Sequence, residues 1–220
     1  MQETHVIIER VGSIIKKKYH RSVLLVGDEE LYKRTELIKE LSNVYEAIPK
    51  TRFHWEGEFL VLEQKKLHPK TWPEKSSDKL IEILLKFAEE LDNISSAIVH
   101  GDITKKNLIL DSNKLYLIDW EPCLKQIRRG YSTLLYTEPY RSLNDIKNNI
   151  LSYETDKIAF FFSCLYILYR RRPLGVIREI VLARKKQAIC ITPIHESTFV
   201  LLNFQELVNL AIENKNWKLN

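Results

Sequence analysis

The chain has 220 residues, with 34 Lys and Arg against 29 Asp and Glu for a formal net charge of +5, and 45 % of its residues are hydrophobic. This composition excludes a disordered chain or a fibrous repeat, and it suffices for one large domain or two tightly joined lobes. The positive balance permits anionic partners such as nucleotide phosphates or nucleic acid but identifies none of them.

The first part of the chain predicts strands followed by one helix. Short β-branched runs on both sides of Gly12 predict two strands within residues 5–20, and residues 21–28 predict a third. Apolar residues at helical spacing then predict an amphipathic helix over residues 29–44.

A hairpin and a connector follow this helix. Residues 53–64 contain two apolar runs around a Glu-Gly turn, which is typical of a β-hairpin. Pro69 and Pro73 mark the connector after it. We place the boundary between two lobes at this connector, with an N-terminal β-rich lobe over residues 1–68 and a helical C-terminal lobe over residues 69–220.

The second part of the chain is predicted to be mainly helical. Residues 77–94 form a long helical pattern, with Ser77 as its N-cap. Two short apolar runs, residues 107–110 and 115–119, predict a compact hairpin because turn-forming residues separate them. The most apolar run, residues 158–169, is too short for a transmembrane helix, which needs about 20 residues, so we expect a buried core helix and no membrane span.

The cysteines and the start of the chain bear on its location. Cys123, Cys164 and Cys190 are odd in number, and their spacings fit neither a disulfide framework nor a zinc site, so we expect reduced thiols. The start carries no basic segment followed by an apolar segment with a small-residue cleavage site. Both observations predict a cytoplasmic protein.

Four polar side chains surround the second hairpin at fixed offsets. His100 and Asp102 precede it, Asn107 lies five residues after Asp102, and Asp119 follows the second strand. Because the hairpin returns Asp119 beside the other residues, an amide and two carboxylates are expected to face one cavity. Oxygen ligands of this kind suit Mg²⁺, which commonly binds through one or two carboxylates and substrate phosphates. The remaining carboxylate could orient a hydroxyl, as phosphoryl transfer requires.

The string His100-Gly101-Asp102, followed by four residues and Asn107, with Asp119 after the next strand, resembles the protein-kinase-like superfamily. The glycine variant is typical of aminoglycoside and choline kinases and of the small atypical kinases associated with tRNA threonylcarbamoylation. The resemblance implies ATP and Mg²⁺ as cofactors, Asp102 as catalytic base, Asn107 and Asp119 as metal ligands, and His100 as a scaffold residue. It also implies an α+β, two-lobed fold with a reduced N-terminal β-lobe and a mainly helical C-terminal lobe.

Residues 14–17 resemble the kinase strand whose lysine holds the α- and β-phosphates. We choose Lys16 for this role and keep Lys17 as the alternative, because the alternation of a strand does not say which of the two points inward. The following helix should offer this lysine a glutamate. Glu36 and Glu40 lie one turn apart on one face, and we choose Glu36.

The nucleotide is expected to meet the second strand of the first hairpin. Residues 59–64 resemble the strand and hinge that bind adenine through main-chain groups, here at Leu62, Glu63 and Gln64. No G-x-G-x-x-G motif precedes Lys16. The phosphates are therefore covered differently, or the first lobe is trimmed.

Features after the second hairpin favour a protein substrate. Residues 136–145 resemble the end of a protein-kinase activation segment, and Asp156 lies where such kinases begin their central apolar helix. Arg128 and Arg129 could meet a phosphate or an acidic partner. Thr104 stands where serine/threonine kinases usually carry a lysine, which weakens the identification of the substrate.

The leading hypothesis is an ATP- and Mg²⁺-dependent kinase that transfers the γ-phosphoryl group to a protein Ser/Thr hydroxyl. One alternative changes the acceptor to a small molecule such as a sugar, an aminoglycoside or a lipopolysaccharide core. The other is a pseudokinase or an RNA-associated scaffold. Nucleic acid ranks below ATP as the anionic partner, because the basic clusters at residues 16–18 and 170–172 lack the aromatic interleaving of known readers.

Overall fold

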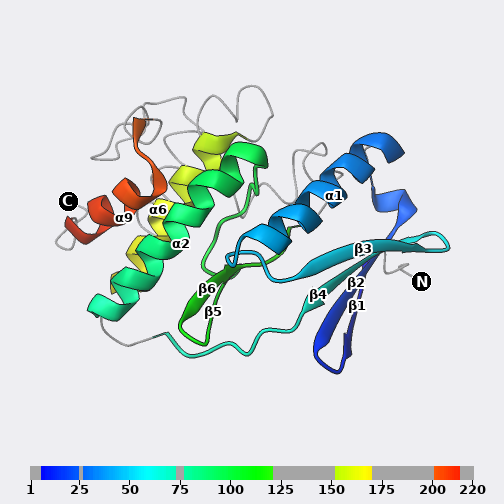
Figure 1. The fold of residues 1–220 in the computed structure, drawn as a ribbon, viewed down its shortest axis with the longest axis horizontal. Coiled ribbons are helices and arrows are strands. Elements are labelled where there is room, and N and C mark those ends of the chain that lie inside the picture. The colour runs from blue at the N-terminus through cyan, green and yellow to red at the C-terminus, as the bar shows by residue number, and fades with distance from the viewer. Residues whose placement is uncertain (1–5, 25–26, 73–76, 121–151, 170–200, 214–220) are drawn as a thin grey trace, which may run out of the picture.

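The computed structural model describes residues 6–24, 27–72, 77–120, 152–169 and 201–213. A sheet and one helix form one side of the molecule, and the other helices with a small hairpin form the other side (Figure 1). In chain order the elements are β1 (Val6–Val11), β2 (Ile14–His20), the 3₁₀ helix η1 (Arg21–Val23), α1 (Asp28–Val44), β3 (Thr51–Glu56), β4 (Phe59–Lys65), α2 (Asp78–Ala97), β5 (Leu108–Asp111), β6 (Lys114–Leu117), α6 (Tyr153–Tyr169) and α9 (Phe204–Glu213).

The N-terminal sheet is antiparallel, with strand order β1-β2-β4-β3. Gly12 and Gly57 take positive φ angles of 58° in its two tight turns, a conformation that glycine adopts at little cost. The strands predicted around Gly12 and the predicted hairpin that carries β3 and β4 are confirmed, as is helix α1.

The strand predicted over residues 21–28 is wrong. Arg21–Val23 forms the 3₁₀ helix η1 instead, and α1 begins at Asp28. The His20 ring accepts a hydrogen bond from the Ser22 amide at 3.2 Å, which satisfies a donor that a strand would have paired with a neighbouring strand. The chain therefore turns directly after β2.

The second side of the molecule confirms the elements predicted there. The Ser77 side chain caps α2 by accepting the Leu80 amide at 3.3 Å, as expected for an N-cap serine. Ser112 and Asn113 adopt positive φ angles in the turn between β5 and β6. The apolar run forms α6, which packs with α2 and α9.

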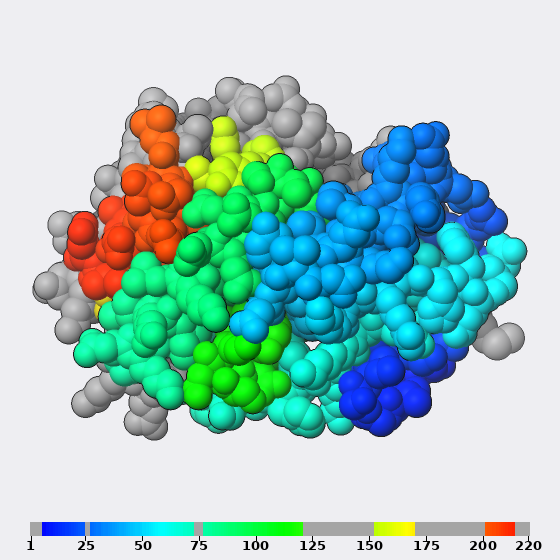
Figure 2. Space-filling model, viewed as in Figure 1, coloured from blue at the N-terminus to red at the C-terminus, as the bar shows by residue number. Residues whose placement is uncertain are grey.

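One hydrophobic core joins the two sides. Most of its buried residues come from α2, α6 and α9, and Ile38 and Leu41 of α1 and residues of β5 and β6 also belong to it. A smaller cluster between α1 and the sheet contains Tyr19, Leu31 and Leu60. Helix α1 thus packs on the sheet and on the helical side, and Figure 2 shows the two sides in continuous contact.

This arrangement is the expected α+β fold, with a small β-rich N-terminal lobe and a mainly helical C-terminal lobe. The lobe boundary after residue 68 stays a prediction. Among the described residues, no helix is long and apolar enough to cross a membrane. Cys164 is a buried free thiol in α6, and burial raises its pKa.

Candidate functional site

The loop before β5 is fixed by the ring of His100. Its Nδ1 atom accepts the Asp102 amide at 3.1 Å, and its Nε2 atom donates to the Ile118 carbonyl at 2.9 Å. Burial lowers the pKa of His100 to about 4, so near neutral pH the ring is uncharged, with its proton on Nε2. The edge of this ring packs on Trp120, with 4.6 Å between ring centroids. His100 therefore positions the loop, in agreement with its expected scaffold role.

Asp156 of α6 holds the same loop through its side chain. Its two carboxylate oxygens accept the His100 amide at 2.8 Å and the Gly101 amide at 2.7 Å. Gly101 has a φ of 82°, which allows the two consecutive amides to point at one carboxylate. Burial raises the pKa of Asp156 to about 7, and the two amide donors and the positive charge of Arg34 oppose this rise.

Asp102 and Asn107 meet directly. The Asn107 side-chain amide donates to Oδ2 of Asp102 and to its main-chain carbonyl, both at 2.9 Å. The oxygen of the Asn107 side chain is then the atom through which this buried residue could bind a metal. The Asn107 main-chain carbonyl accepts the Ile118 amide at 2.9 Å. This bond brings Asp119, the next residue, to the same place.

Asp119 joins the two lobes through Lys17. It follows β6 with a φ of 67°, a conformation that is costly for a residue other than glycine. Nζ of Lys17, on β2, donates to its Oδ1 atom. Asp119 remains 35 % exposed, so its carboxylate is accessible to solvent beside a lysine that is 13 % exposed. The structure thus brings Asp102, Asn107, Asp119 and Lys17 together at the junction of the lobes.

Lys16 lies on the opposite face of β2, because successive side chains of a strand alternate between faces. Its Nζ atom pairs with the buried Glu63 carboxylate at 2.6 Å, and Arg52 pairs with the other oxygen of Glu63 at 2.5 Å. Lys16, chosen from the sequence for phosphate binding, therefore does not meet Asp119, and Lys17 does.

Glu36 also lies away from the site. Its carboxylate pairs with Lys39 of the same helix at 2.8 Å, so the expected ion pair with a β2 lysine is not formed by Glu36. Another residue of α1, Arg34, contacts the C-terminal lobe: its Nη2 atom donates to the Val99 carbonyl at 3.2 Å. The sequence analysis did not select Arg34. Its spacing of three and four residues from the buried Leu31 and Ile38 places it on the buried face of the helix, and a cation on such a face is the signal that could have identified it.

The main-chain groups of Leu62, Glu63 and Gln64 are occupied within the sheet. All three belong to β4, a central strand that is paired with β2 on one side and with β3 on the other. In such a strand alternate residues bond to opposite neighbours. The adenine contacts expected at these residues stay a prediction, and in this structure all three residues lie within the sheet. The ladder continues as far as Lys66, whose amide donates to the Ser13 carbonyl at 2.8 Å.

Several predicted features lie outside the described residues. These are the segment 136–145, the arginines at 128 and 129, the basic run 170–172, and Cys123 and Cys190.

The site fits a cation that completes its coordination with phosphate oxygens. The described residues hold no group of three or more His, Cys, Asp or Glu side chains that could bind a metal unaided. They do present the amide oxygen of Asn107 and the carboxylate of Asp119, the hard oxygen ligands that Mg²⁺ uses together with a nucleotide.

Known structures share this architecture. The pseudokinase domain of BIR2, an immune regulator of the RLK/Pelle family, superposes with a TM-score of 0.58 at 13 % identity, over 99 % of this chain and 84 % of that one. The kinase domain of PknI from Mycobacterium tuberculosis gives 0.55 at 11 % identity, over 96 % and 90 %, and a double mutant of that domain gives 0.56 at 12 %. No family model matches the sequence, and no curated protein does. The chain therefore has a protein-kinase-like fold.

Proposed function

We propose that the protein is a kinase that uses ATP and Mg²⁺ to phosphorylate a Ser or Thr hydroxyl of a protein. The observation that carries this proposal is the meeting of Lys17, Asp102, Asn107 and Asp119 between the lobes, in contacts that link residues up to 102 positions apart. Phosphoryl transfer depends mainly on positioning and on cationic charge, and this arrangement supplies both.

Each residue has a distinct role in this proposal. Asp102, held by Asn107 and by the His100 ring, accepts or orients the proton of the attacking hydroxyl. Asn107 and Asp119 hold Mg²⁺, which neutralises charge on the phosphates when it is bound. Lys17 takes the phosphate-binding role for which the sequence favoured Lys16, because Lys17 is the lysine beside Asp119.

The adenine would bind where the chain leaves the sheet. The last main-chain hydrogen bond that continues the pairing of β4 with β2 is that of Lys66. The connector then contacts the C-terminal lobe, where the His68 amide donates to Asp111 at 2.9 Å. The carbonyl of Lys66 and the main-chain groups of Leu67 are therefore further proposed adenine contacts, because the Lys66 amide is bonded to Ser13.

The protein acceptor is supported by the placement of Asp156. This aspartate lies in the first turn of the central apolar helix, and its carboxylate anchors the loop that carries Asp102, as the resemblance to protein kinases implied. A small-molecule acceptor remains the alternative. Comparing ATP consumption with protein extracts against a panel of sugars and aminoglycosides distinguishes the two acceptor classes.

The test uses labelled ATP, the full chain and a host protein extract, with the label located by mass spectrometry. Wild-type protein should transfer phosphate to itself or to a protein in a Mg²⁺-dependent reaction. Asp102→Ala should lower this transfer by about 10²- to 10⁴-fold, the range for a positioned acid or base, and should retain ATP binding. The matched control is Asp78→Ala, at an exposed position in the first turn of α2. Equal transfer by Asp102→Ala and wild type would refute the assignment.

A pseudokinase is the second candidate, because Lys17 and Asp119 already satisfy each other. ATP and Mg²⁺ must separate this ion pair before Asp119 can bind a metal and Lys17 a phosphate. A scaffold that binds nucleotide without turnover would show the same contact. Mg²⁺-dependent ATP turnover that is lost in Asp119→Asn eliminates this candidate, whereas an inactive wild type supports it.

A further inference from the structure

The side chain of Arg34, on α1, reaches the loop that contains Asp102. Its Nη2 atom donates to the carbonyl of Val99, the residue before His100, at 3.2 Å. Its Nε atom is buried and has no hydrogen-bond partner in the part of the chain that the structure describes. A buried guanidinium with a donor left unsatisfied costs free energy, so this residue needs a compensating interaction.

Burial lowers the pKa of Arg34, and two nearby carboxylates oppose this shift. Asp156 has no exposed surface, and its charge acts on Arg34 in the sense that favours the guanidinium, as does the charge of Glu30 on the preceding turn of α1. Arg34 in turn favours the ionised form of Asp156, against the cost of its burial. The same positive charge disfavours protonation of His100. Arg34 is thus electrostatically coupled to both residues that fix the Asp102 loop.

We propose that Arg34 is a positioning residue, which couples helix α1 to the catalytic loop by binding the Val99 carbonyl next to His100. This role rests on the proposed kinase function for its effect on rate, but its structural effect can be measured without any activity. It differs from the expected coupling through Glu36, which pairs within its own helix.

Helix α1 packs against both lobes. Ile38 and Leu41 of the same helix pack in the core shared with α2, α6 and α9, while Leu31 packs against the sheet. A displacement of α1 therefore moves the guanidinium relative to Val99 and Asp156. Misplacement of a catalytic group by about 1 Å can cost 10²-fold in rate, so a small movement of the helix is enough to control Asp102.

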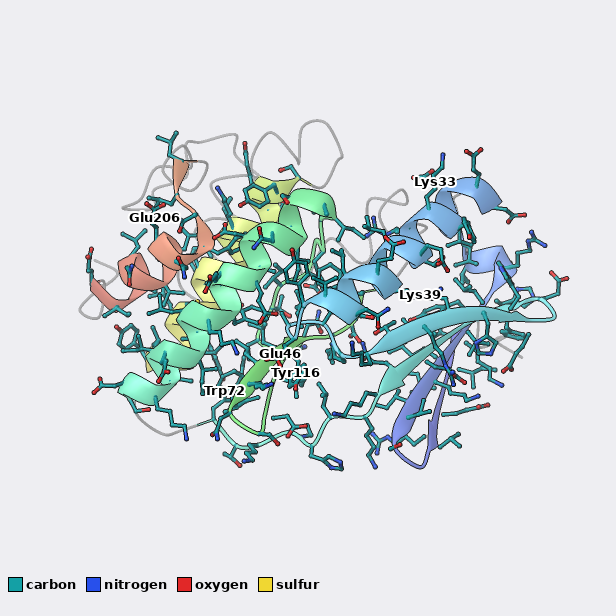
Figure 3. All side chains as sticks on the ribbon, in the orientation of Figure 1. Lys33, Lys39, Glu46, Trp72, Tyr116 and Glu206 are labelled. Carbon is teal, nitrogen blue, oxygen red and sulfur yellow. The ribbon has the colours of Figure 1, made fainter. Side chains whose placement is uncertain are left out.

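The kinetic test compares Arg34→Met, Arg34→Lys and the control Lys33→Met, with Mg²⁺-dependent ATP turnover as the readout. Lys33 is the neighbouring residue of α1, is 72 % exposed, and points away from the C-terminal lobe (Figure 3). Arg34→Met should lower kcat by about 10- to 100-fold and leave KM for ATP within twofold, since it disturbs the loop and not the nucleotide contacts. Arg34→Lys should recover part of the loss, because it keeps the charge. A loss in Lys33→Met equal to that in Arg34→Met would overturn the proposal, as would an increase in KM with kcat unchanged.

The second test is residue-resolved amide hydrogen exchange of the proteins without nucleotide. The amides of His100 and Gly101 should exchange at least about tenfold faster in Arg34→Met than in Lys33→Met, because the preceding Val99 carbonyl loses its hydrogen bond to α1 and the loop opens more often. Adding Arg34→Met to Asp156→Asn should produce little further increase, since the two act on the same bonds. Unchanged exchange at both amides overturns the proposal. If Arg34→Met does not fold, Arg34→Gln, which also removes the charge, is compared with Lys33→Met by the same criterion.

The two tests separate the two proposals. If wild type shows no turnover but exchange at His100 and Gly101 depends on Arg34, then the kinase function fails and the positioning role stands. If turnover depends on Asp102 but neither rate nor exchange depends on Arg34, then the positioning role fails and the kinase function stands.

Discussion

The two lobes contribute to the site in different ways. In the C-terminal lobe, the loop from His100 to Asn107 is held by bonds to α6, to Ile118 directly after β6, and within itself. In the N-terminal lobe, one lysine of β2 reaches the site, and the neighbouring lysine pairs on the other face of the sheet. The loop that carries Asp102 is therefore preorganised by many contacts, whereas the N-terminal lobe contributes to the proposed site through the ion pair of Lys17 with Asp119.

This difference predicts where substitutions act on rate and where they act on folding. Groups buried behind the loop should control stability and geometry together. Charged groups of the sheet and of α1 should divide sharply into the few that reach the site and the many that remain solvated, since exposed ion pairs contribute little.

The largest expected effect distinguishes Lys17 from its neighbour. Lys17→Met should lower ATP turnover by about 10²- to 10³-fold, the range for removing one preorganised donor from a charged transition state, while Lys16→Met should retain activity within about threefold. Steady-state turnover of both variants measures this ratio. Lys17 pairs with Asp119 and Lys16 pairs with Glu63, so each variant removes one lysine and one ion pair and the two are a matched pair. The reverse ranking would return the phosphate-binding role to Lys16.

The second prediction concerns the buried groups behind the loop. Burial raises the pKa of Asp156 from 3.8 to about 7, so its contribution to stability is fully present at low pH and is lost as pH rises through 7. Burial lowers the pKa of His100 from 6.5 to about 4, so its contribution is present above pH 6.5 and is lost as pH falls toward 4. In the wild type the two changes oppose each other over the same pH range.

Asp156→Asn removes one of these two titrations. On acidification from pH 7 to pH 4, its free energy of unfolding should fall by roughly 3 kcal/mol more than that of the wild type. The variant loses the stabilisation that protonation of Asp156 gives the wild type over this range, whereas the destabilising protonation of His100 remains. Urea unfolding at pH 7, 5.5 and 4 measures the difference between the two proteins, in which all other titrations cancel. Parallel profiles would show that Asp156 does not titrate in this range.

A smaller effect is expected where the loop meets α6 near its surface. Nζ of Lys105 donates to the Tyr166 hydroxyl at 3.3 Å and lies 4.4 Å from the centroid of its ring. Tyr166→Phe keeps the ring and removes the hydrogen bond, which should destabilise the protein by about 0.5–1 kcal/mol. Thermal unfolding beside the control Tyr32→Phe, at a residue that is 67 % exposed, measures this cost. A change no larger than that of the control would show that the ring alone holds Lys105.

The clustering of Asp102, Asn107 and Asp119 could be predicted from the sequence because their spacing is set by local structure. A hairpin with turn-forming residues returns Asp119 beside Asn107 whatever the rest of the chain does, so the cluster follows from order along the chain. Local spacing could not predict whether Lys16 or Lys17 of β2 points toward the site. The faces of β2 are exchanged by a shift of one residue, and the pairing with β4 and the packing of α1 decide which face carries Lys17.

Longer-range features escaped the sequence for the same reason. Periodicity gave the extent of β4, but its place in the centre of the sheet, which occupies the main chain of residues 62–64, depends on topology. The partner of Glu36 was decided by a lysine three residues away, which competes successfully with a lysine on another element because it costs less chain ordering. The role of Arg34 depends on tertiary structure, which brings the Val99 carbonyl within hydrogen-bond distance of α1.

The smallest expected effect tests this local competition. Glu36→Gln removes an ion pair in which Lys39 is 44 % exposed and Glu36 33 % exposed, so the loss of stability should not exceed about 0.5 kcal/mol. ATP turnover should stay within twofold of the wild type, because Arg34, and not Glu36, links α1 to the catalytic loop in this structure. Turnover and thermal unfolding of Glu36→Gln are compared with those of Glu40→Gln, one turn further along the helix at an exposed position. A tenfold loss specific to Glu36→Gln would mean that α1 rotates during the reaction to bring Glu36 to Lys17, and that the contact with Lys39 belongs only to the resting protein.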